Sequence, residues 1–179
     1  MSQINFQDIV IEWLKMGPML IVSRIFSGES LQDQAWQRSA LYTLLGFTTY
    51  YITTKNFIGT EQFGEYKPIA DTWFKFGTMM IVSHLLAGGS LTDRNWQMGS
   101  LYTLLGFTAY NLLTSKFIQG NQFAENPAVV TTINNWVEVG TMLVVSRLLG
   151  GGNLQDRDWQ RSSLGTILGY SAYDFLSRL

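Results

Sequence analysis

Apolar residues are concentrated in three similar segments of this chain, and each segment contains nearly the same stretch of sequence. Residues 91–110 read LTDRNWQMGSLYTLLGFTAY, residues 31–50 read LQDQAWQRSALYTLLGFTTY, and residues 154–173 read LQDRDWQRSSLGTILGYSAY. A segment that recurs in this way is one structural unit used several times. The pattern therefore predicts three tandem copies of one unit.

Each unit is predicted to contain two helices, because a second apolar segment precedes each copy of the repeat. The landmarks of that segment recur as well, since Trp13 returns as Trp73 and Trp136. Uninterrupted apolar segments of this length are typical of helices. We expect the first helices at about 7–27, 69–87 and 132–149, and we expect the second helices to end near residues 54, 115 and 178.

The junction between the two helices carries glycine and then an acidic residue. Glycine follows each first helix, where a left-handed residue often ends a helix. A polar residue with Asp three positions later comes next, which resembles a capping box with Asp in place of Glu. A connection of two to four residues would make each unit a tight antiparallel hairpin. The glycines are Gly28, Gly88–Gly89 and Gly150–Gly152, and the capping pairs are Ser30 with Asp33, Ser90 with Asp93, and Asn153 with Asp156.

These elements predict an all-α chain of three tandem helical hairpins. The repeats span 1–54, 69–115 and 132–179, and linkers span 55–68 and 116–131. Two helices return the chain to the side it left, so all three units share one orientation. We therefore expect a pseudo-threefold six-helix bundle.

Composition alone does not decide whether this bundle spans a membrane. Charged residues make up 14% of the chain, against roughly 25% in soluble domains. The mean hydropathy of +0.08 is nevertheless low for a protein with many membrane spans. The longest uncharged run, residues 95–115, is about as long as a bilayer-spanning helix.

The placement of tryptophan favours the transmembrane interpretation. One set lies near the start of the first helices and the other near the start of the second helices, so antiparallel helices bring the sets to opposite ends. Aromatic belts of membrane proteins have this distribution. The alternative is that tryptophans fill a soluble core. The predicted interfacial residues are Trp13, Trp36, Trp73, Trp96, Trp136 and Trp159.

Arginines gather at the hairpin tips, whereas lysines lie towards the linkers. The planar guanidinium group can bind a carboxylate or a lipid phosphate with two hydrogen bonds. We therefore expect the tip arginines to contact a partner protein or lipid. They are Arg24, Arg38, Arg94, Arg147, Arg157 and Arg161.

Small residues share one face of each second helix. Their helical spacing would let neighbouring helices approach closely, which is the main route to helix association in lipid. The alternative is that the same face lines a narrow polar pore. The predicted helix-packing face consists of Ser39, Thr43, Gly46, Gly99, Thr103, Gly106, Ser162, Thr166 and Gly169.

No residue pattern predicts catalysis, a cofactor or a metal. The chain has no cysteine and one histidine, His84, which is too few ligands for an ordinary zinc site. The carboxylates are interpreted as helix caps or as members of local pairs, such as Glu12 with Lys15 and Asp71 with Lys75. The formal net charge of −1 argues against nucleic acid as a partner.

The repeated unit LxDxxWQxxSLYTLLGFTAY, with its uncharged helix and amphipathic linkers, resembles small membrane-associated virion proteins of large icosahedral double-stranded DNA viruses. This resemblance implies a minor capsid protein at the inner membrane, with capsid proteins as partners. We expect a non-enzymatic, membrane-embedded structural protein. The alternatives are a small channel or transporter and a soluble helical scaffold.

Overall fold

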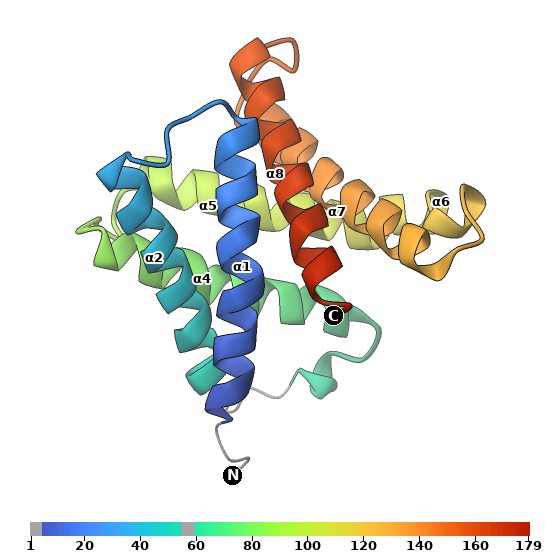
Figure 1. Cartoon of the computed structure of the whole chain (residues 1–179), viewed down its shortest axis with the longest axis horizontal. Coiled ribbons are helices and arrows are strands. Elements are labelled where there is room, and N and C mark those ends of the chain that lie inside the picture. Colours follow the sequence, from blue (N-terminus) through green and yellow to red (C-terminus); the bar gives the residue numbers. More distant parts are fainter. Residues whose placement is uncertain (1–4, 55–59) are drawn as a thin grey trace.

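The computed structural model describes residues 5–54 and 60–179, and every regular element within these ranges is helical. This confirms the expected all-α class. Residues 1–4 of the first predicted repeat and residues 55–59 of the first predicted linker lie outside the described residues. The main helices are α1 (Phe6–Phe26), α2 (Gln34–Thr49), α4 (Lys67–Leu86), α5 (Arg94–Ala109), α7 (Pro127–Leu149) and α8 (Arg157–Leu176) (Figure 1).

Shorter helical elements occupy the linker side. The second helices of units one and two continue into π-helical turns, whereas α8 continues as an ordinary helix to its end. Such π-turns are rare and frequently lie at functional sites. The short elements are η1 (Tyr50–Thr54), η2 (Glu61–Tyr66), η3 (Tyr110–Thr114), α6 (Ser115–Phe117) and η4 (Gly120–Gln122).

The glycines at the ends of the first helices have the expected left-handed conformation. Gly28, Gly88 and Gly151 have φ angles of 73°, 80° and 72°. The residue after each glycine donates its backbone N–H to a carbonyl one turn back in the helix, as in a Schellman motif. This part of the sequence prediction is confirmed.

The predicted capping box and the short connection are both wrong. Asp33 is itself the N-cap of α2, and its side chain accepts a hydrogen bond from the backbone N–H of Ala35. The hydroxyl of Ser30 instead accepts from the backbone N–H of Gln32. The chain therefore makes a further turn before each second helix begins, and the connections span 27–33, 87–93 and 150–156.

The most extensive helix contacts join different units. Helix α2 packs against α4, α5 packs against α7, and α8 packs against α1. The two helices within each unit meet over shorter stretches. The pairing of the first helix with the last, visible in Figure 1, closes the series into a ring. A tight hairpin is therefore not the main packing unit.

Glycine permits the close approach in all three inter-unit pairs. A Cβ atom placed on Gly46 would lie 2.7 Å from the carbonyl oxygen of Met79. Equivalent atoms on Gly106 and Gly169 would lie 2.6 Å and 2.5 Å from the carbonyl oxygens of Met142 and Met19. Backbones meet this closely only where one partner has no side chain.

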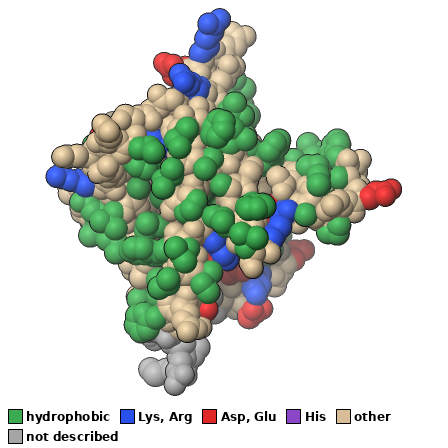
Figure 2. Space-filling model, viewed as in Figure 1, with side chains coloured by type: hydrophobic (Ala, Val, Ile, Leu, Met, Phe, Trp, Pro, Cys, Tyr) green, Lys and Arg blue, Asp and Glu red, His purple; other side chains and the backbone are tan. Residues whose placement is uncertain are grey.

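The interior is small and the surface is rich in apolar side chains. Among the described residues, eight apolar side chains are buried, whereas thirty large ones are exposed. Figure 2 shows apolar side chains spread over much of the viewed face.

Among the described helices, only α7 is long and apolar enough to cross a membrane by length and composition. In Figure 1, the helices cross obliquely and do not run parallel.

Candidate functional site

A series of cavities runs between the helices from the hairpin tips to the linker side. The central cavity, of about 220 Å³, is mostly apolar and lies among α1, α2, α4 and α8. Its wall includes Met16, Thr43, Met79, Ser83 and Tyr170. Methionine adapts to irregular spaces, so this wall can change shape at low cost.

The tip cavity, of about 400 Å³, adjoins the central cavity on the side of the hairpin tips. It is lined by Ser39, Thr103 and Trp96, and it shares Met80 and Ser83 with the central cavity. Hydroxyl groups of serine and threonine thus lie on both sides of the shared wall. The tip cavity is partly polar and opens towards the outside of the bundle.

Two linker cavities adjoin the other side of the central cavity. The inner linker cavity, of about 250 Å³, contains Asp71 and Glu138 in its wall. The outer linker cavity, of about 440 Å³, contains Asp8 and Glu12. Lys75 belongs to the walls of the central cavity and of both linker cavities. It therefore occupies the point where these three spaces meet.

Lys75 is held against aromatic rings. Its Nζ atom lies 5.7 Å from the ring centroids of both Phe47 and Phe76. A cation over an aromatic face is attracted to the negative side of the ring quadrupole. The rings therefore stabilise the ammonium group in a partly buried position.

Two carboxylates of α1 on the linker side, Asp8 and Glu12, are bound by tyrosines and by Lys15. The hydroxyl of Tyr173 donates to Glu12 Oε2 at 2.6 Å, which links α8 to α1. Lys15 Nζ lies 3.1 Å from Glu12 Oε1, so the predicted local pair is present. The hydroxyl of Tyr51 donates to Asp8 at 2.5 Å. Ionisable groups therefore connect separate helices at this end.

Asp71 has a partner that the sequence interpretation did not identify. Its side chain accepts a hydrogen bond from the hydroxyl of Thr60 at 2.5 Å. The sequence interpretation considered only pairs within one helix, and it therefore did not identify the ionisable lining of the cavities. One signal was present in the sequence: Lys15, Lys75 and Glu138 occupy the same position of the three units, two residues after the first tryptophan.

The predicted small-residue face divides into two groups. The glycines Gly46, Gly106 and Gly169 make the close helix contacts described above. Of the hydroxyl residues, Thr43 lines the central cavity, and Ser39 and Thr103 line the tip cavity together with Gly99. Gly99 has open space where a Cβ would lie. Within the described part of the chain, Ser162 and Thr166 line none of the cavities named here.

The first tryptophan of each unit forms a hydrogen bond inside its own unit. The indole N–H groups of Trp13 and Trp73 donate at 2.8 Å to Thr48 and Thr108, and that of Trp136 donates at 2.6 Å to Ser171. Each bond joins the first helix of a unit to the second. These tryptophans therefore also tie the two helices of a unit together.

The second tryptophan of each unit lies beneath a basic or aromatic side chain at the tip. The guanidinium of Arg24 lies 5.6 Å above the ring of Trp36, and that of Arg147 lies 5.8 Å above Trp159. In the second unit, the imidazole of His84 stacks on Trp96 at 4.3 Å. The three tips therefore share one local arrangement.

Two of the predicted partner-binding arginines are engaged within their own tips. Arg24 Nη2 lies 2.8 Å from Asp33, and Arg147 Nη2 lies 2.7 Å from Asp156. The backbone N–H of Trp159, followed by that of Asp158 and the charge of Arg147, outweighs partial desolvation and lowers the pKa of Asp156. The remaining tip arginines, Arg38, Arg94, Arg157 and Arg161, are exposed.

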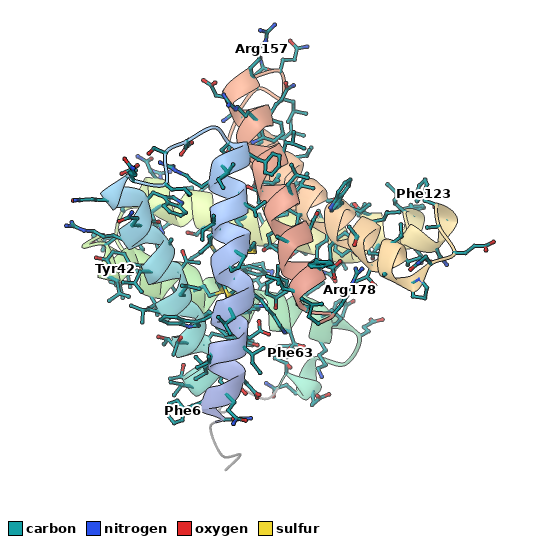
Figure 3. The ribbon with its side chains drawn as sticks, viewed as in Figure 1. Phe6, Tyr42, Phe63, Phe123, Arg157 and Arg178 are labelled. Carbon is teal, nitrogen blue, oxygen red and sulfur yellow. The ribbon has the colours of Figure 1, made fainter. Side chains whose placement is uncertain are left out.

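Figure 3 shows Arg157 at the outer end of α8, far from the linker residues Phe63 and Phe123.

Comparison of the chain with family models, with curated proteins and with solved structures finds no match. The functional argument therefore uses the residues and geometry of this chain alone.

Proposed function

We propose that the chain is a non-enzymatic, membrane-embedded structural protein, with three helical hairpin units arranged about a pseudo-threefold axis. The observation that carries this proposal is the distribution of side chains on its helices. Apolar side chains face outwards and several charged side chains face inwards, which is the reverse of a soluble bundle.

Helix α1 has this distribution along its length. Phe6, Val10 and Leu14 are 69%, 58% and 67% exposed, and Ile21 and Ile25 continue the same stripe. On the opposite side of the helix, the side chains of Lys15 and Glu12 are only 20% and 22% exposed. A stripe of large apolar residues facing water is unfavourable, whereas the same stripe facing acyl chains is not.

The total accessible surface area of the chain also supports a covering of lipid acyl chains. The chain has a mass of 20.3 kDa, for which a monomeric soluble protein would expose about 8,800 Å². Its accessible surface is 11005 Å². The helices alone therefore bury less surface than a self-sufficient soluble domain, and lipid would supply the missing contacts.

Helix length and charge placement fit this interpretation. Helix α7 has 23 residues and is therefore about 35 Å long, enough to cross a hydrocarbon core of about 30 Å. Charges such as Glu12, Lys15 and Lys75 lower the hydropathy of the other first helices. Because they lie between helices, they would remain shielded from acyl chains.

The exposed tip arginines are suited to an anionic surface. Arg38, Arg94, Arg157 and Arg161 would meet lipid phosphates or the carboxylates of another structural protein. The resemblance of the repeat to virion membrane proteins leads us to propose such a partner in a capsid shell above an inner membrane. On this proposal, the chain anchors the shell to the bilayer as a minor capsid protein.

Membrane integration can be tested by alkaline carbonate extraction and by flotation with liposomes. We expect the expressed chain to stay in the membrane fraction and to float with lipid. Recovery of a folded, monodisperse chain in buffer without detergent would instead support the soluble scaffold.

A matched pair of variants sharpens this test. Leu14→Asp places a charge in the apolar stripe of α1, whereas Leu31→Asp places one in the connection at the first tip, and both side chains are exposed. Lipid contact predicts that Leu14→Asp lowers the integrated fraction and that Leu31→Asp leaves it unchanged, since a charge at the bilayer centre costs about 2.5–3.5 kcal/mol. Equal behaviour of the two variants would contradict the proposed orientation of α1.

A further inference from the structure

We infer that the tip, central and linker cavities form a permeation path for small monovalent cations, with Lys75 as its gate. The inference rests on the proposed membrane location, because a path has a function only where the bundle separates two compartments. It goes beyond a structural role, since an anchor needs no series of adjoining cavities between its helices.

The order of the cavities is the first argument. The tip cavity shares Met80 and Ser83 with the central cavity, so two side chains form the wall between them. The central cavity shares Lys75 and Tyr170 with the inner linker cavity, and Lys75 and Tyr173 with the outer one. Movement of a few side chains would therefore join the tip side to the linker side.

The polar residues that line the cavities are the second argument for a permeation path. Hydroxyl groups of Ser39 and Thr103 line the tip cavity, and those of Thr43 and Ser83 continue into the central cavity. Hydroxyl oxygens can replace part of the hydration shell of a small cation. The apolar methionines between them form a short constriction that an ion would have to cross.

The charge of the linker cavities determines the sign of the permeating ion. Their walls contain the four carboxylates of Asp8, Glu12, Asp71 and Glu138, but only two lysines, Lys15 and Lys75. An excess of negative side chains between low-dielectric walls raises the local concentration of cations. Rings of acidic side chains select cations in the same way.

Lys75 opposes the passage of a cation at the junction of three cavities. Its ammonium group lies over Phe47 and Phe76, and Glu138 belongs to the wall of the same inner linker cavity. A positive charge in this position repels a second cation until the side chain moves towards the carboxylates. Lys75 is therefore placed to act as a gate.

The experiment measures potassium flux into proteoliposomes that contain a potassium-sensitive dye, together with flotation of the same samples. The wild-type chain is expected to give flux above that of protein-free liposomes. Lys75→Met keeps an unbranched side chain, one atom shorter, and removes its charge, so we expect potassium influx to rise by roughly tenfold, because a unit charge acts strongly in a medium of low dielectric constant. Chloride influx should remain at the level of protein-free liposomes.

Thr43→Leu and Thr166→Leu form the matched control. Both threonines occupy the same position of their units, and each donates at 3.0 Å to the carbonyl four residues earlier. Only Thr43 lines the central cavity. We expect Thr43→Leu to reduce potassium influx by at least about fivefold, since its added bulk narrows the constriction, and Thr166→Leu to leave it unchanged.

The outcomes separate the two proposals. A chain that floats with liposomes but gives no potassium flux, both as wild type and as Lys75→Met, overturns the permeation path and leaves the structural role intact. Equal effects of Thr43→Leu and Thr166→Leu also overturn the path. Failure of the chain to integrate overturns both proposals.

Discussion

The hairpin tips and the linker-side ends of the helices differ in how faithfully the three units repeat. At the tips, each unit has an Asp N-cap, a left-handed glycine and a tryptophan beneath Arg24, His84 or Arg147. At the linker side, equivalent positions hold Lys15, Lys75 and Glu138. The residues that form the turn at each tip are therefore repeated in all three units. The residues at the equivalent linker-side position differ in charge, so the ionisable interior of the bundle is asymmetric.

The difference has a physical origin. The capping bonds, the ion pairs and the ring contacts described above for the tips each join residues of one unit, so they do not depend on the other units. The glutamine side chains of Gln37, Gln97 and Gln160 illustrate this, since each donates to the backbone carbonyl six residues earlier. On the linker side, Tyr173 reaches Glu12 from the opposite end of the chain. Such contacts exist only when the ring of helices is closed.

The largest expected effect concerns the close glycine contacts between neighbouring units. Gly106→Ala would bring a Cβ to 2.6 Å from the carbonyl oxygen of Met142, so we expect the free energy of unfolding to fall by about 2 kcal/mol through overpacking. Gly99→Ala on the same helix meets nothing within 4 Å and should stabilise the helix by about 0.5 kcal/mol. Thermal unfolding in detergent, followed by circular dichroism, measures both. Equal stability of the two variants would contradict the close contact of α5 with α7.

A smaller effect is expected from the hydrogen bond that joins the two helices of a unit. Trp73→Phe removes the indole N–H that donates to Thr108 at 2.8 Å, and should cost about 1 kcal/mol. Trp96→Phe at the tip keeps an aromatic ring against His84 and should cost less. Chemical denaturation of both variants checks the order, and a greater loss for Trp96→Phe would contradict it.

The pH dependence of stability tests the tip of the third unit. The pKa of Asp156 lies below its ordinary value of 3.8 in the folded chain, so the unfolded chain takes up a proton first as pH falls. The charged carboxylate therefore stabilises the fold above about pH 4, and this contribution is lost as pH falls through the lowered pKa. Asp156→Asn should reduce stability at neutral pH and approach wild type in acid. A pH-independent difference in the midpoint of unfolding would contradict this.

The smallest effect concerns the second tip, where a histidine stacks on the tryptophan in place of the arginine of the other two tips. His84→Arg should allow an ion pair with Asp93, as Arg24 forms with Asp33 at 2.8 Å. We expect a gain of about 0.5 kcal/mol, because such exposed pairs contribute little. The gain should disappear in an Asp93→Asn background, and a double-mutant cycle of unfolding free energies measures it. An undiminished gain in that background would exclude the ion pair as its cause.

The sequence correctly predicted features that depend on neighbouring residues. It did not predict the residue at which each second helix begins. Helices and terminal glycines follow from short-range patterns, and the structure contains them. The N-cap was assigned to Ser30, with Asp33 as its capping-box partner, because both residues are good N-caps and the sequence does not show which one begins the helix. The connections were consequently predicted too short.

The sequence by itself determined the threefold duplication, the helical class and the glycine that ends each first helix, because these depend on interactions within a few residues. Only the tertiary structure decided that α1 packs against α8, that Gly46, Gly106 and Gly169 meet methionine backbones, and that Lys75 lies where three cavities meet. The physical reason is that these positions depend on how whole helices cross. A repeated local pattern is compatible with several such crossings.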